Sequence, residues 1–173
     1  MGEQIFGGKY RSESLIFEDK LGKVFKGTDT ESGSVVFITA FDPRMNVTDE
    51  KANRVLKTNL ELSELLAPQI LIGLDAGCEG ENRFIAAEGC EFAPLKSLIK
   101  AGNGLQPADA LGIAYQICSA LRNAAGAGIN HLDLNSQNIF VDGDRAGGFR
   151  IRIARYGFSE LVPPYSAGKK NDL

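Results

Sequence analysis

Runs of apolar residues change their spacing along the chain, from a strand-like pattern near the start to a helical one further on. The first part contains short runs of β-branched and aromatic residues, which fit the half-buried surface of a sheet. Residues 28–33 (TDTESG) are polar and end in glycine, which predicts a hairpin turn. The predicted strands cover residues 15–17, 23–26 and 35–38.

Residues 49–67 have apolar positions mostly three or four apart, which predicts a helix. Thr48 or Asp49 suits the N-cap, and Pro68 ends the pattern because proline interrupts a helix. Shorter elements are predicted to follow: strands at 70–74 and 83–87, and a helix at 93–100.

Residues 107–127 form the clearest predicted helix, because Pro107 suits a first turn and the apolar positions continue for five turns. These positions cover most of the circumference, which is typical of a helix packed on several sides. Two more strands are predicted at 138–141 and 149–154. Strands with one helix, then mostly helix, then a late hairpin indicate an α+β fold in two lobes.

Composition sets the class of protein and excludes several others. The 173 residues are 43% hydrophobic and 24% charged, which is typical of a globular domain. A net charge of −3 argues against nucleic-acid binding, which needs a basic surface. No apolar run approaches the roughly 20 residues of a membrane span, and the first residues do not resemble an export signal. We therefore expect a cytoplasmic protein with no membrane and no nucleic-acid partner.

Three cysteines and one histidine offer little for a disulfide framework or a metal site. Cys78, Cys90 and Cys118 are odd in number and none forms a CxxC pair, so we expect buried, reduced thiols. A zinc site would need His131 together with all three scattered cysteines. We expect no metal.

Five segments follow one another in a characteristic order along the chain. They are LGKVFKGTDTESGSVVFITAF (21–41), LLAPQILIGLDAG (65–77), RFIAAEGCEFAPLKSLI (83–99), HLDLNSQNIFV (131–141) and FRIRIARYGFSEL (149–161). Together they resemble the motifs of the protein kinase fold, over about residues 10–161. The resemblance implies a β-rich N-lobe at residues 1–88, a shortened helical C-lobe at 89–165 and a disordered tail at 166–173. A kinase continues through an activation segment and further helices, for which little sequence remains.

The resemblance places several unusual residues in the nucleotide cleft. In the phosphate-covering loop, Phe17 and Asp19 replace two glycines and only Gly22 is kept. In the following strand, Phe37 replaces the small alanine beside the adenine, and Thr39 replaces the phosphate-pairing lysine. The glutamate that would pair with that lysine aligns best with Thr58, with Glu61 one turn away.

The catalytic loop is better kept than the metal-binding loop. His131 and Asp133 match the H-R-D motif, and Asn138 follows five residues later. In an active kinase Asp133 would accept the hydroxyl proton and Asn138 would hold a metal ion; the alternative is that both stabilise the turn. Arg155 replaces the metal-binding aspartate. Arginine stays protonated and cannot coordinate magnesium, but it could pair with Asp133 or Glu88.

These changes lead to the expectation of a catalytically inactive pseudokinase, not an enzyme, that binds no cofactor and no Mg-ATP. It would act in signalling or scaffolding through protein contacts. The uncovered flank of the helix at 107–127 is the expected surface, for a partner protein or for self-association as a dimer.

Three alternatives remain open. The first is an atypical phosphotransferase that uses Asp133 and Asn138 with a relocated lysine: Lys20, Lys23 or Lys26. The second is a nucleotide-binding switch without catalysis, which Phe37 opposes. The third is a cleft that binds another small ligand.

Overall fold

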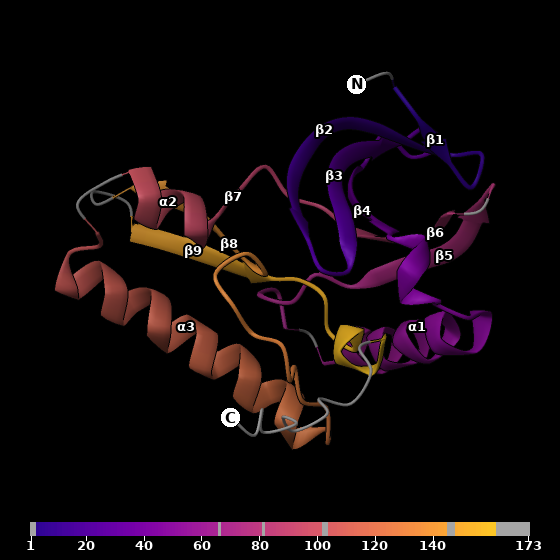
Figure 1. Ribbon diagram of the computed structural model, residues 1–173. Helices are drawn as coiled ribbons and strands as arrows, with labels where there is room; N and C mark the ends of the chain where they lie inside the picture. Colours follow the sequence, from indigo (N-terminus) through magenta and orange to yellow (C-terminus); the bar gives the residue numbers. More distant parts are fainter. Residues whose placement is uncertain (1–2, 66, 81, 102–103, 145–147, 162–173) are drawn as a thin grey trace, which may run out of the picture.

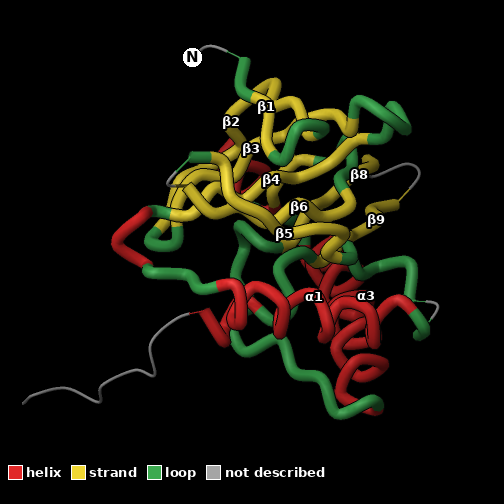
Figure 2. The backbone as a smooth tube through the Cα atoms, turned by 90° about the vertical axis from the view of Figure 1, so that its right-hand side faces the viewer, coloured by secondary structure: helices red, strands yellow, loops and turns green. Residues whose placement is uncertain are grey.

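The computed structural model describes residues 3–65, 67–80, 82–101, 104–144 and 148–161. The tail at 166–173 lies outside the described residues. Figure 2 shows most strands gathered above, with α1 (Asp49–Ser63) and α3 (Pro107–Gly126) beneath them. The predicted α+β architecture in two lobes is confirmed.

The first lobe is a six-stranded antiparallel sheet that curves around its own core, with α1 packed against the strand β5 (Figure 1). β4 is buried on both faces. Val36 and Ile38 pack among the aromatic side chains inside the curve, while Phe37 and Thr39 face the second lobe. In spatial order the strands are β1 (Ile5–Phe6), β2 (Tyr10–Asp19), β3 (Gly22–Asp29), β4 (Val35–Phe41), β6 (Asn82–Glu88) and β5 (Gly73–Glu79).

α1 begins where the sequence predicts. The hydroxyl of Thr48 accepts a hydrogen bond from the backbone N–H of Lys51, which satisfies one free donor of the first turn. The buried positions recur at spacings of three, four and three, as expected for one face of a helix. They are Ala52, Val55, Asn59 and Leu62.

The second lobe packs α3 beneath a small sheet (Figure 1). Ile113, Ala120 and Ala124 are the buried residues of α3. They join a core with Ile151 and Ile153 of the last strand. The elements are β7 (Ala93–Pro94), α2 (Leu95–Ala101), α3, β8 (Ile139–Asp144) and β9 (Gly148–Ile153), with a 3-10 helix at Phe158–Leu161.

The strand predicted at 70–74 is confirmed only at residues 73 and 74, because residues 70–72 connect the lobes. Ile70 forms an isolated parallel bridge with Ile153, and the backbone N–H of Leu71 donates to the oxygen of Ile153 at 2.8 Å. Ile70 and Leu71 are each 2% exposed. The strand itself is β5 and begins at Gly73. An apolar run therefore indicated burial correctly but not its cause, as is common for short runs.

Candidate functional site between the lobes

The loop between α3 and β8 is built on a buried histidine. His131 is 3% exposed, and its Nε2 lies 2.9 Å from the backbone oxygen of Ala154. Its Nδ1 accepts a hydrogen bond from the backbone N–H of Asp133 at 3.4 Å, so Nε2 carries the proton and donates to Ala154. Burial lowers the pKa of His131 from its usual 6.5, which keeps the ring neutral at pH 7.

Asp133 and Asn138 lie at the two ends of a turn that they help to stabilise. The side-chain Nδ2 of Asn138, a buried residue, donates to the backbone oxygen of Asp133 at 2.9 Å. Nδ2 of Asn135 donates to the same oxygen at 3.1 Å. The neighbouring Leu132 has a φ of 57° and is 80% exposed. The loop thus keeps its compact shape although it places a large apolar side chain in solvent.

Arg155 crosses from the second lobe to the end of β2. Its Nη1 lies 2.6 Å from Oδ2 of Asp19 and 3.3 Å from Oδ1 of Asn138. The guanidinium also lies over the rings of Phe158 and Phe17, at 5.1 Å and 5.7 Å. The Arg155 side chain is only 5% exposed. The cation at the metal-ligand position and the anion at a glycine position are therefore partners of each other.

This pairing corrects the partners that the sequence offered for Arg155, which were Asp133 and Glu88. Oε2 of Glu88 instead accepts a hydrogen bond from the backbone N–H of Ile72 at 3.2 Å. The sequence identified Asp19 only as a replacement of a glycine in the phosphate-covering loop. It reaches Arg155 because the β2–β3 turn folds over the cleft, where Oδ1 of Asp19 also accepts from the backbone N–H of Leu21 at 2.9 Å.

Two phenylalanines fill the space between the lobes. Phe37 of β4 and Phe140 of β8 stack with ring centroids 4.5 Å apart and an interplanar angle of 25°. They are 4% and 1% exposed. The cavity that remains beside them is about 10 Å³, room for about one water molecule. In this conformation the protein's own side chains occupy the cleft.

The polar wall of this cavity comes from α1 and β4. Thr39, which is 4% exposed, and Asn59, which is 2% exposed, both line it. Oδ1 of Asn59 accepts from the backbone N–H of Gly73 at 2.8 Å, and its Nδ2 donates to the backbone oxygen of Tyr156 at 3.2 Å. Asn59 therefore ties α1 to β5 and to the segment that carries Arg155.

Sequence reasoning missed Asn59 and pointed to its neighbours instead. Thr58 is half-buried and does not line the cavity, and Glu61 is exposed. The signal was available, because Asn59 continues the helical spacing set by Val55 and Leu62 on the buried face.

Gly22 is required by the hairpin itself. It has a φ of 142°, and a Cβ there would lie 2.1 Å from the backbone oxygen of Ala40. Of the site residues suggested by sequence, the structure brings together Phe17, Phe37, Thr39, Arg155, Asp19 and Asn138, while Gly22 lies in the β2–β3 hairpin.

The lysines near the hairpin lie away from the cavity. Lys26 pairs with Glu91, Lys20 is exposed, and Lys23 lines a separate pocket of about 550 Å³ on the other face of the sheet. Among the described residues that line the cavity, Arg155 carries the only positive charge. No group of three or more His, Cys, Asp or Glu in the described part of the chain is placed to hold a metal ion.

A family model described as "Protein kinase domain" matches residues 10–171. The chain belongs to the protein kinase family. Among curated relatives, the serine/threonine-protein kinase pkn3 of Myxococcus xanthus is 29% identical over 155 residues, which cover 89% of this chain and 28% of that protein. The probable serine/threonine-protein kinase PknB of Lactococcus lactis is 25% identical over 171 residues, covering 98% of this chain and 27% of that protein. This kinase-family chain thus spans about a quarter of these relatives' length.

Solved structures agree on the fold. The kinase domain of Mycobacterium tuberculosis PknI matches with a TM-score of 0.68 and 20% identity, over 91% of this chain and 63% of that one. In the described part of the chain, no helix combines the length and hydrophobicity needed to cross a bilayer.

The comparisons overturn one expectation. The expectation that the chain is not an enzyme is wrong, because the protein kinase family is a family of enzymes and the curated relatives are named serine/threonine-protein kinases. The substitutions at Thr39 and Arg155 had led to that expectation. They describe the cleft of this member and do not remove the chain from the family.

Proposed function

We propose that this chain is a signalling domain of the protein kinase family that works by binding another protein molecule. In this proposal its cleft is held closed to Mg-ATP by its own side chains. In this proposal the two lobes are residues 1–88 and 89–165, and it is described residues of each lobe that line the cleft. The observation that carries the proposal is the occupied cleft: the stacked pair Phe37–Phe140 beside the ion pair Arg155–Asp19.

Charge supports the closed cleft. In the family, an aspartate at the position of Arg155 holds Mg²⁺ against the phosphates. A magnesium ion within about 4 Å of this guanidinium would be repelled by about 8 kcal/mol at an effective dielectric near 20, twice the value for two unit charges. Phosphate groups would also approach Asp19, which already neutralises Arg155.

Packing supports it as well. An adenine ring would have to displace Phe37 or Phe140, which are both almost fully buried. Separating an aromatic pair costs about 0.5–1.5 kcal/mol beyond the buried area that is lost. The packing of the cleft and its charges therefore both oppose nucleotide binding.

Phosphotransfer is the second candidate function. The turn around Asp133 and Asn138 keeps a compact geometry, and the named relatives are kinases. A relocated lysine would have to move into the cleft, since Lys20, Lys23 and Lys26 lie elsewhere in this conformation.

Nucleotide binding by thermal shift tests the proposal. A ligand at about 100 times its dissociation constant stabilises a protein by about 2.7 kcal/mol, which for a chain of this size raises Tm by about 5–10 °C. We expect no shift for the wild type with Mg-ATP or with ATP alone. The double variant Phe37→Ala/Arg155→Asp, which opens the base site and restores a metal ligand, should gain a shift.

The control is Leu60→Ala, a change on the exposed side of α1, which should behave like the wild type. A Tm increase with Mg-ATP in the wild type would overturn the closed cleft. Transfer of labelled phosphate to a protein substrate, lost in Asp133→Asn, would then establish the second candidate.

A further inference from the structure

The sheet of the first lobe curves until its two edges meet. β1 lies beside β2 at one edge, and it also contacts β5 at the other edge (Figure 1). The hydroxyl of Tyr10 donates to Oδ2 of Asp75 at 3.3 Å, and Nζ of Lys9 lies 3.8 Å from the same oxygen. These contacts hold the edges together. They bring Gln4, just before β1, and Asn82, at the start of β6, into the lining of one pocket.

This sheet pocket has a volume of about 550 Å³. Small-molecule sites typically measure about 300–1,000 Å³ and often lie at the mouths of β-barrels. Phe6, Phe25 and Phe41 supply its apolar lining and are buried or half-buried. The sheet pocket lies on the opposite face of the sheet from the cleft. Lys23 and Phe25 line the sheet pocket, whereas Val24 between them lines the cleft, as the alternation along a strand requires.

Two opposite charges line the sheet pocket without pairing with each other. Glu18 of β2 and Lys23 of β3 are direct partners across the two strands. Directly opposite residues have Cβ atoms about 4.5–5.5 Å apart. In the described part of the chain, neither side chain has an ion-pair or hydrogen-bond partner. Both charges are therefore available to a ligand, side by side.

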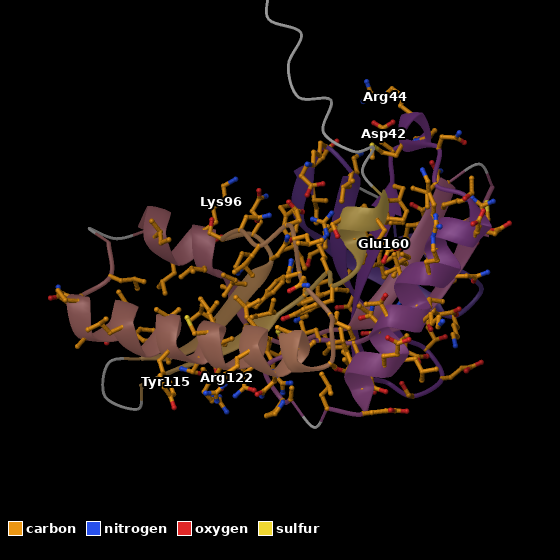
Figure 3. All side chains as sticks on the ribbon, turned by 90° about the horizontal axis from the view of Figure 1, so that it is seen from below. Asp42, Arg44, Lys96, Tyr115, Arg122 and Glu160 are labelled. Atoms are coloured by element: carbon orange, nitrogen blue, oxygen red, sulfur yellow. The ribbon has the colours of Figure 1, made fainter. Side chains whose placement is uncertain are left out.

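The remaining charge in the lining is already neutralised. Asp42 lies at the end of β4, and its Oδ1 accepts hydrogen bonds from the backbone N–H and from Nε of Arg44, both at 2.9 Å. Figure 3 shows the two side chains together at the edge of the molecule. With this pair accounted for, the sheet pocket offers one positive and one negative charge beside an aromatic surface.

That combination favours a ligand with a carboxylate, an ammonium group and an apolar part. A ligand with the carboxylate alone would face the like charge of Glu18, and one with the ammonium group alone would face Lys23; such like-charge contacts oppose binding. A peptide segment fits less well, because its α-amino and α-carboxyl charges are lost in amide bonds. In a free amino acid the two charges sit on one carbon, as close together as Glu18 and Lys23 are on neighbouring strands.

We propose that the sheet pocket binds a free α-amino acid with a large apolar side chain. The carboxylate pairs with Lys23, the ammonium group pairs with Glu18, and the side chain lies against the phenylalanines. This goes beyond the proposed function, since it concerns the face of the sheet turned away from the cleft. Glu18 directly precedes Asp19, whose carboxylate crosses the cleft to Arg155. A bound amino acid would therefore hold the hairpin that carries this ion pair.

An NMR titration of the full chain with L-phenylalanine tests the proposal. We expect saturable shifts of the backbone amides of Lys23 and Phe25, with a Kd of about 1 mM or tighter, as for a ligand of this size. Two matched compounds, 3-phenylpropionate and phenethylamine, each keep the ring and only one charge. Both should bind at least about tenfold more weakly, because each leaves one charge of the sheet pocket facing a like charge or no partner.

Two variants assign the charges. Lys23→Gln should remove the preference for L-phenylalanine over phenethylamine, and Glu18→Gln should remove its preference over 3-phenylpropionate. Both change polar side chains that are not buried, so the variants should fold like the wild type. Lys20→Gln is the control, because Lys20 is an exposed lysine of the same hairpin that does not line the sheet pocket, and binding should be unchanged.

Several results would overturn the proposal. One is the absence of saturable shifts up to about 20 mM, where a site of that affinity would be nearly full. Another is equally tight binding of N-acetyl-L-phenylalanine amide, which would identify a peptide chain as the occupant. Shifts at Phe140 in the cleft without shifts at Lys23 would place the ligand elsewhere. No nucleotide enters this titration, so its outcome is independent of whether the cleft binds Mg-ATP.

Discussion

Replacing Asp19 by asparagine removes one charge of the ion pair that crosses the cleft and little else. Oδ1 of Asp19 also accepts a hydrogen bond from the backbone N–H of Leu21, and asparagine keeps that acceptor. The guanidinium of Arg155 would retain Oδ1 of Asn138 at 3.3 Å. Its Nε and Nη2 have no hydrogen-bond partner among the described residues even in the wild type. The variant therefore leaves a buried cation without its anion.

The expected loss follows from the burial of the two partners. Removing one member of a fully buried ion pair costs about 3–5 kcal/mol, whereas an exposed pair contributes about 0–1 kcal/mol. The Arg155 side chain is 5% exposed and the Asp19 side chain 21% exposed. We expect Asp19→Asn to lower the free energy of unfolding by about 2–3 kcal/mol, between these limits. For a chain of this size Tm would fall by about 4–12 °C.

Urea unfolding of a double-mutant cycle measures the pair itself. The four proteins are the wild type, Asp19→Asn, Arg155→Met and the double variant. Arg155 has a φ of 70°, and methionine there bears the same backbone strain, so strain cancels in the cycle. Asp42→Asn is the control, because the side chain of its partner Arg44 is 90% exposed and both lie at the edge of the molecule (Figure 3). It should lower the free energy of unfolding much less than Asp19→Asn does.

A coupling energy below about 0.5 kcal/mol, no larger than that of an exposed pair, would refute the reasoning. The pair would then be screened by solvent and would not hold the lobes together. A double variant as stable as the wild type would not refute the reasoning. Replacing a whole buried ion pair by apolar groups often leaves the free energy of unfolding unchanged.

Two further predictions concern buried titratable rings. Because burial lowers the pKa of His131, the unfolded chain binds a proton at this residue at higher pH than the folded chain does, and stability should fall as pH drops from about 7.5 to 5.5. The urea midpoint should fall less over this range in His131→Gln. An equal fall in that variant would show that another group causes the pH dependence. Burial raises the pKa of Tyr156 to about 12, and its hydroxyl has no partner among the described residues. Tyr156→Phe should leave stability unchanged or raise it by about 1 kcal/mol. Tyr10→Phe is the control and should lower stability, because the hydroxyl of Tyr10 donates a hydrogen bond to Asp75. A clear loss of stability in Tyr156→Phe would show that its hydroxyl has a hydrogen-bond partner after all.

Much of the fold could be predicted from local patterns. Thr48 as the N-cap of α1 and Pro107 as the start of α3 depend on neighbouring residues only, and both predictions are confirmed. The motifs gave the family because they are short and occur in a fixed order. Residues 70–72 were wrongly predicted as part of a strand, since burial between two lobes and burial within a sheet require the same apolar residues.

The site was less predictable than the fold. The sequence identified Phe37 and Arg155 as unusual, but not the residues that they meet. Asn59 went unnoticed because a polar residue on a helix is ordinarily exposed, and only the packing of α1 against β5 makes it a buried link.

The sequence by itself determined which chemical groups the cleft holds: an arginine where the family has a metal-binding aspartate, a threonine in place of a lysine, and a phenylalanine beside the base site. Only the tertiary structure decided how those groups are used. Arg155 and Asp19 are 136 residues apart in the chain, and Phe37 and Phe140 come from different lobes. Such pairs form when the lobes close and bury them, and because that closure depends on packing across the whole molecule, no local pattern of residues specifies it.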